Sequence, residues 1–193
     1  MKNSFLFSVG YPLGNTANEE NSFYIERCDS MYNLSNTIIH YIWSKCMNGI
    51  SYESLKESFD AVFDGEVQLD GYLQELIDNK FVLQINSEDN SLNYEIMKNF
   101  KLLRQGVGLG AINDSNSRYI HYSGEECEIE VLEYNVWLMA NGNKTVSNII
   151  DEFKVIMNLN EDDSIDIITA IVVLVGKGLI VILGELNGAK RFF

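Results

Sequence analysis

Apolar residues recur at helical spacing in three successive segments of the first half of the chain. The segments start near Asn36, at Ser51 and after Asp64-Gly65. A spacing of three and four residues places side chains on one face of a helix. The pattern therefore predicts three helices, whose inward residues are Ile38, Ile39, Ile42, Trp43 and Cys46, then Tyr52, Leu55, Phe59, Val62 and Phe63, then Leu69, Tyr72, Leu73, Leu76 and Ile77.

Short stretches rich in β-branched and aromatic residues surround these helices. Turn residues interrupt them, as expected for strands joined by tight connections. The predicted strands are residues 5–9, 23–28, 31–34, 81–85 and 92–97. The last two would form a β-hairpin around the polar turn at residues 86–90.

The same order of patterns returns about 94 residues later. Trp43 and Trp137, the two tryptophans of the chain, fall on matching positions. A repeat of this length indicates a duplicated domain rather than a solenoid. The second copy predicts strands at 118–122, 128–131 and 179–183, and helices at 132–140, 146–157 and 164–176.

Three helices followed by a small antiparallel sheet predict an α+β fold of tandem winged-helix domains. The first domain would span residues 1–100 and the second residues 101–193. Residues 98–117, which contain three glycines, would connect them and could add a strand.

Charge narrows the possible partners. The chain has 28 Asp and Glu against 14 Lys and Arg, a formal net charge of −14, and both halves are acidic. Proteins that grip nucleic acid need a basic face to neutralise phosphates. Nucleic acid is therefore an unfavourable partner, and basic peptides or protein faces are favoured.

The residue types used for catalysis and metal binding are sparse. Cys28, Cys46 and Cys127 match no metal-ligand spacing, and free thiols in a reducing cytoplasm are expected. His40 and His121 lie in no nucleophile or metal-binding pattern. We predict no catalytic residue, no metal site and no cofactor.

Three further patterns have simpler interpretations. The glycines at 106, 108 and 110 depart from the dinucleotide fingerprint, and residues 158–169 lack the glycine and final glutamate of a calcium loop. Asp166 and Gly176-Lys177-Gly178 interrupt the apolar stretch at 165–183, so no membrane span is expected. The apolar run at 5–9 is too short for a signal peptide, and a cytoplasmic location is expected.

The two copies resemble PqqD-like domains, the small winged-helix domains that recognise precursor peptides in ribosomal peptide modification. The resemblance covers residues 23–85 and 118–183. Its matching residues are Asn33, Leu34, Trp43, Asn48, Gly49, Ile50, Ser51, Leu55 and Phe59, and in the second copy Ile129, Trp137, Asn141, Gly142, Thr145, Val146, Ile149, Phe153, Gly178, Leu179 and Ile180.

This resemblance implies that a peptide adds to a sheet edge against the third helix. The expected edge residues are Met31, Tyr32, Asn33 and Leu34, with Ile129 and Val131 in the second copy. The expected groove wall is Tyr72, Leu76 and Lys80, with Ile168, Val172 and Val175 in the second copy.

Three function classes remain open. The first is a non-catalytic recognition module that presents a ribosomal precursor peptide to a modifying enzyme. The second is an acidic tandem winged-helix scaffold subunit of a protein complex, whose ligand would be a folded subunit instead of an unstructured peptide. The third, a transcriptional regulator, is disfavoured because Asp70, Glu75 and Asp78 on its reading helix would repel phosphates. Oligomerisation is possible in each class.

Overall fold

The protein has an α+β fold. The computed structural model describes residues 4–15, 22–63, 67–86, 88–112, 117–158 and 164–185. Within these residues the chain forms seven helices and four three-stranded antiparallel sheets. None of the described helices is long and apolar enough to cross a membrane.

The first series of elements contains two sheets and three helices. Its elements are β1 (Ser4–Ser8), β2 (Tyr11–Asn15), β3 (Phe23–Arg27), β4 (Ser30–Asn33), α1 (Thr37–Lys45), β5 (Ile50–Ser51), α2 (Tyr52–Phe63), α3 (Leu69–Asp78) and β6 (Val82–Asn86). One sheet has the order β5-β1-β6 and the other β2-β3-β4. The predicted first strand is confirmed, and it lies at the centre of its sheet.

The second series repeats this order after one additional helix, α4 (Asn90–Met97). Its elements are β7 (Phe100–Arg104), β8 (Val107–Gly110), β9 (Arg118–Tyr122), β10 (Glu125–Ile129), α5 (Val131–Met139), β11 (Asn141–Thr145), α6 (Val146–Met157), α7 (Ser164–Gly176) and β12 (Ile180–Glu185). Its sheets, β11-β7-β12 and β10-β9-β8, match those of the first series. The winged-helix description and the domain boundary stay predictions.

The two tryptophans make the same contact in both series. Trp43 on α1 donates from Nε1 to the carbonyl oxygen of Val9 at 3.0 Å. Trp137 on α5 donates to the carbonyl oxygen of Gln105 at 2.9 Å. Each indole is buried, so it fills a core while satisfying a carbonyl at the end of the central strand.

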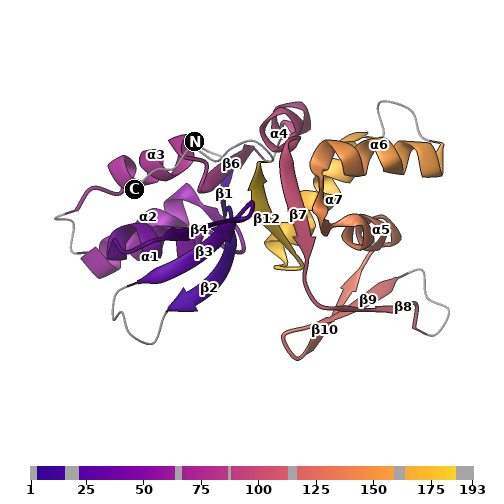
Figure 1. Cartoon of the computed structure of the whole chain (residues 1–193), viewed down its shortest axis with the longest axis horizontal. Helices are drawn as coiled ribbons and strands as arrows, with labels where there is room; N and C mark the ends of the chain where they lie inside the picture. The colour runs from indigo at the N-terminus through magenta and orange to yellow at the C-terminus, as the bar shows by residue number, and fades with distance from the viewer. Residues whose placement is uncertain are drawn as a thin grey trace.

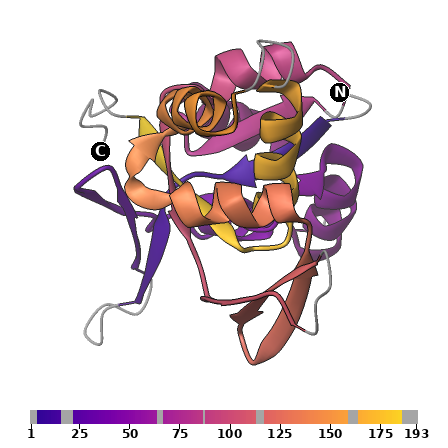
Figure 2. The ribbon, with the colours of Figure 1, turned by 90° about the vertical axis from the view of Figure 1, so that its right-hand side faces the viewer.

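The two series share a hydrophobic core. Phe7 and Val9, from β1 and the residue after it, and Leu83 and Ile85 of β6 are buried in the cluster formed mainly by the second series. The sheet β5-β1-β6 therefore lies between the first set of helices and the second series, near the middle of the molecule in Figure 1. The sheets β2-β3-β4 and β10-β9-β8 project from this body in both views (Figures 1 and 2).

The prediction of a strand at residues 92–97 is wrong, because this segment is α4. Asp89 caps the helix by accepting a hydrogen bond from the Leu92 amide at 2.9 Å. A capped amide favours a helical first turn, and Leu92 and Ile96 then follow on one face. β6 consequently has no hairpin partner after it.

Two further predictions need correction. Residues 98–117 are more than a connection, because β7 and β8 lie in them and β7 is the central strand of its sheet. Val131 is the first residue of α5 instead of a strand residue. The polar residues 113–116 and the predicted acidic loop at 159–163 lie outside the described residues.

Candidate functional site

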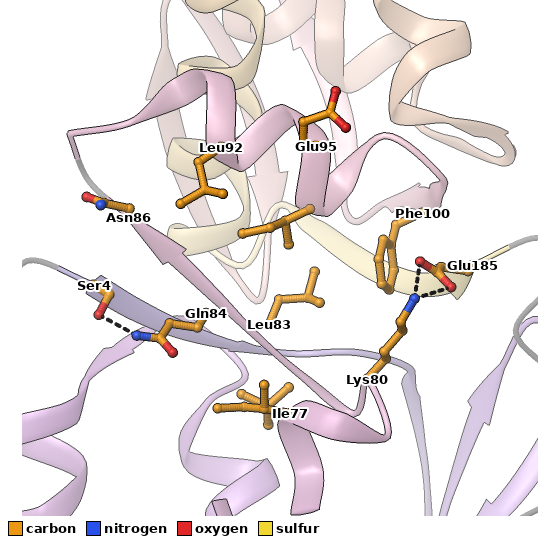
Figure 3. A pocket seen from close by; sticks show the side chains of 12 residues that line it. Ser4, Ile77, Lys80, Leu83, Gln84, Asn86, Leu92, Glu95, Phe100 and Glu185 are labelled. Atoms are coloured by element: carbon orange, nitrogen blue, oxygen red, sulfur yellow. Dashed lines mark hydrogen bonds and ion pairs between the residues drawn. The ribbon is translucent and has the colours of Figure 1, made fainter. Parts of the chain in front are cut away.

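A groove of about 640 Å³ runs along β6. Figure 3 shows β6 crossing its floor, with α4 on one side and Ile77 on the other. Leu92, Glu95 and Ile96 supply the α4 wall, while Phe100 and Glu185 come from β7 and β12. Its volume falls within the range of about 300–1,000 Å³ that is typical of ligand sites.

The floor of the groove is the outer edge of a strand. β6 pairs only with β1 among the described strands, which makes it an edge strand. The Val9 amide donates to the carbonyl oxygen of Phe81 at 2.9 Å, so the Phe81 carbonyl points toward the chain of β1. The direction of backbone groups alternates along an antiparallel strand. The backbone amides and carbonyls of Leu83 and Ile85 therefore point toward β1. The backbone groups of Val82 and Gln84 point toward the outer edge.

Asn93 closes one end of this edge. Its side-chain oxygen accepts from the Asn86 amide at 2.9 Å, and its Nδ2 donates to the Asn86 carbonyl at 2.6 Å. These contacts confirm that Asn86, two residues after Gln84, directs its backbone groups outward. An asparagine side chain thus takes the place of a neighbouring strand at Asn86, whereas at Gln84 the edge borders the groove. Val82 also lines the groove but is fully buried.

An ion pair closes the other end of the groove. Lys80 Nζ lies 2.6 Å from a carboxylate oxygen of Glu185, and it joins the two series across 105 positions of sequence (Figure 3). On the α4 wall, Glu95 is paired with Lys98 at 2.6 Å. The hydrogen bond to Glu95 raises the pKa of Lys98. Each of the two carboxylates in the lining is therefore paired with a lysine.

The residues predicted on the first sheet edge lie on β4 or directly after it. β4 is an edge strand, as predicted. Met31 is 66% exposed, whereas Leu34 is buried. The Tyr32 ring packs edge-on against Phe81 with ring centroids 5.2 Å apart. The Asn33 amide donates to Tyr24 and Ser22 hydroxyl oxygens. None of the four lines the groove along β6.

The residues predicted on the groove walls do not form one surface. Lys80 lines the groove along β6, and Tyr72 borders a separate hollow on α3 with Val67, Gln68, Gly71 and Glu75. Val172 is half-buried. Leu76, Ile168 and Val175, which were predicted on the walls, are core residues in this structure, and so is Ile129, which was predicted on the second sheet edge. Each of the four is at most 3% exposed. Val175 also borders a small hollow beside Gly10 and Gly178, away from the groove along β6.

Val131 borders a smaller apolar pocket of about 240 Å³ between α5, α6 and α7. The equivalent place in the first series is filled by Tyr41, whose ring packs edge-on against Phe59 and Phe63. Asn135 stands at the position of Tyr41 in the second series and lines the pocket. The two copies of the repeat therefore differ at this position: the first has a tyrosine ring, and the second has the smaller side chain of asparagine.

The described residues hold no group of three or more His, Cys, Asp or Glu arranged to bind a metal. The three cysteines are unpaired. Burial raises the pKa of the Cys46 thiol to about 12, and burial also raises that of Cys28. Neither has the lowered pKa of a nucleophilic cysteine.

His40 makes stability depend on pH. Its ring stacks on Phe23 with centroids 4.0 Å apart, and burial lowers its pKa below 6.5. Above pH 6.5 the imidazole is neutral in both states, but as pH falls the unfolded chain takes up the proton first and stability is lost. Urea unfolding at pH 7.5 and 5.5 is expected to show a larger loss for the wild type than for His40→Gln. An equal loss in both proteins would contradict this assignment.

Comparisons with known proteins do not assign the chain to a family. No protein-family model matches it, and no curated protein matches it. Two solved structures of PKMT2 from Rickettsia typhi, one in complex with AdoHcy, align with TM-scores of 0.36 and 0.34 at 11% and 12% identity. Each alignment covers 93% of this chain and 42% of the PKMT2 chain. The chain thus spans less than half the length of PKMT2, and a similarity of this degree carries no argument about function.

Proposed function

We propose that this protein is a non-catalytic recognition module that binds an extended peptide segment, and that it presents a ribosomal precursor peptide to a modifying enzyme. The observation that carries the proposal is the outer edge of β6, which forms the floor of a groove with apolar walls. A strand edge offers main-chain hydrogen bonds, and apolar pockets beside it select side chains at alternate positions.

The dimensions of the site suit a short extended segment. The stretch from Val82 to Asn86 spans about 13 Å at about 3.3 Å per residue, which matches four or five residues of an added strand. Leu92, which is 46% exposed on α4, offers apolar surface to the ligand. Glu95 offers a carboxylate to a lysine or arginine, because its pair with Lys98 is exposed to solvent and an exposed pair is readily exchanged.

Charge complementarity supports a basic peptide over an acidic one. The whole chain has a formal net charge of −14. The two carboxylates of the groove lining, Glu95 and Glu185, are each paired with a lysine, so the charge that favours a basic ligand is that of the whole chain. The electrostatic field of a negatively charged protein accelerates association with basic ligands and disfavours acidic ones. The binding constant is therefore expected to fall as salt concentration rises.

Peptides selected from a random ten-residue library on the full-length protein test this function. We expect basic peptides with alternating apolar residues, and titration calorimetry should show at least tenfold weaker binding to Leu92→Lys than to the wild type. This change removes apolar wall and adds a repelling charge. Val107→Lys is the matched control, because Val107 is 65% exposed on β8, outside the groove. Equal binding to Leu92→Lys and the control would contradict the proposal.

A second candidate function is a scaffold subunit that holds a folded partner. The observation that favours it is the exposed apolar run at the end of α6, where Val155, Ile156 and Met157 are 82%, 64% and 50% exposed. Exposed apolar patches often mark protein interfaces. Changing Val155 and Ile156 to serine should then weaken capture of the folded partner, while leaving binding of the selected peptides unchanged.

A further inference from the structure

The two series use the outer edges of β6 and β12 differently. In the second series the Gln105 amide donates to the Leu179 carbonyl at 2.8 Å, the counterpart of the bond from Val9 to Phe81. By the same alternation, Ile182 on β12 directs its backbone groups outward. Its sequence counterpart on β6 is Gln84, because Phe81 and Leu179 are equivalent in the repeat.

The outer edge of β12 is already occupied by the chain itself. The Gly10 amide donates to the Ile182 carbonyl at 2.7 Å, and Val9 forms a parallel bridge with Ile182. The segment after β1 thus binds the edge of β12 as an extended chain running in the same direction. The equivalent edge at Gln84 borders the groove.

From this difference we infer that the ligand of the groove is an extended, basic polypeptide segment that runs parallel to β6 and donates a backbone amide to the Gln84 carbonyl. The segment at residues 9 and 10 shows the geometry at the equivalent edge, where the carbonyl of the central residue accepts from the passing chain. Glu95 and Glu185 line the groove but are paired with Lys98 and Lys80, so the preference for a basic segment comes from the net charge of −14 on the whole chain. This inference rests on the proposed function and adds the direction and register of its ligand.

The direction has a consequence for the placement of the peptide. β6 runs from the Lys80–Glu185 pair toward Asn86, where Asn93 already binds the edge. A parallel ligand enters with its N-terminal end near Val82 and leaves toward Leu92 and Asn86. An antiparallel ligand would have the reverse placement.

Gln84→Pro tests the pairing of the ligand with this edge. Proline keeps the carbonyl of residue 84 but removes its outward amide, the other bonding group of a parallel ladder, and its ring obstructs a strand lying against that carbonyl. The bonds to β1 made by Leu83 and Ile85 stay intact, and edge strands tolerate such a proline. Gln84→Ala is the matched control, since it keeps the amide and loses only the side chain, which donates to Ser4 at 3.0 Å. We expect the selected peptides to bind at least tenfold more weakly to Gln84→Pro and within about threefold of wild type to Gln84→Ala.

A spin label on the peptide tests the direction. With the label at the peptide N-terminus, the Val82 amide signal should broaden more than the Asn86 signal, and a label at the C-terminus should reverse this order. The opposite pattern would overturn the inference and leave the proposed function intact. Peptides that bind equally well to Gln84→Pro and to Leu92→Lys would contradict both, because they would then lie outside the groove. Cross-peaks showing two copies of the protein paired along β6 would also overturn the inference.

Discussion

Replacing Phe7 with alanine is expected to lower the free energy of unfolding by about 3–5 kcal/mol, the usual cost of truncating a buried phenylalanine. Phe7 is 3% exposed and lies on β1, the central strand of the first series. Its ring is buried in the core formed mainly by the second series. It also faces Gly49, a residue with φ of +78° where an added Cβ would collide with the ring. The residues around Phe7 are closely packed, so they have little freedom to move into the cavity that the alanine variant would leave.

The same variant tests whether the two series unfold together. Because Phe7, Leu83 and Ile85 join the second core, the variant should unfold in a single transition, shifted to lower urea concentration in both tryptophan fluorescence and circular dichroism. Phe5→Ala is the matched control: Phe5 lies on the same strand but is 43% exposed, and its loss is expected to cost less than about 1 kcal/mol. A Phe7→Ala protein that loses no more stability than the control would contradict the shared core.

Replacing Trp43 with alanine is expected to lower the free energy of unfolding by about 3–5 kcal/mol. Trp43 is fully buried, packs against Phe23 with ring centroids 5.8 Å apart, and bonds the Val9 carbonyl. Truncation leaves both a cavity and a buried carbonyl without its donor. Trp43→Phe separates these effects, since it keeps an aromatic ring and loses the donor, and we expect it to cost about 1–3 kcal/mol.

The second tryptophan provides the comparison. Trp137 is 3% exposed and bonds the Gln105 carbonyl, and its ring lies 5.1 Å from the Arg104 guanidinium carbon. We expect the loss for Trp137→Ala to lie within about 1 kcal/mol of the loss for Trp43→Ala, because the repeated contact is the same. Urea denaturation monitored by circular dichroism measures both. A large difference between the two variants would show that the tryptophans do not have equivalent structural roles.

Much of the local structure could be predicted from the sequence because it depends on local patterns. Apolar residues at helical spacing predicted α1, α2, α3 and their counterparts, and the turn residues around Asn48-Gly49 marked where α1 ends. The identity of α4 depended on one side chain, the Asp89 cap. Without that cap, the alternating residues at 92–97 also suit a strand, and this ambiguity is usual for short apolar segments.

The groove could not be predicted because it depends on contacts between residues far apart in sequence. Lys80 was predicted on the wall of another groove, beside the strand edge at Met31 to Leu34, and its partner Glu185 lies 105 positions away. Gln84, a polar residue within the strand Val82–Asn86, indicated that this position is less buried than its neighbours, but a polar side chain does not show which edge of a sheet is unpaired. The order of strands, which leaves β6 at an edge while residues 9 and 10 occupy β12, arises from tertiary packing.

Amide hydrogen exchange along β6, measured by NMR on the full-length protein with and without a selected peptide, tests the central claim most directly. In the free protein, the Leu83 and Ile85 amides should exchange slowly because they bond to β1, and the Gln84 amide should exchange rapidly at the open edge. Val82 is fully buried, so its amide is not used as a reporter. Peptide binding should slow the exchange of Gln84. Slow exchange at Gln84 in the free protein, or rapid exchange in the complex, would contradict the proposal that this edge receives the ligand.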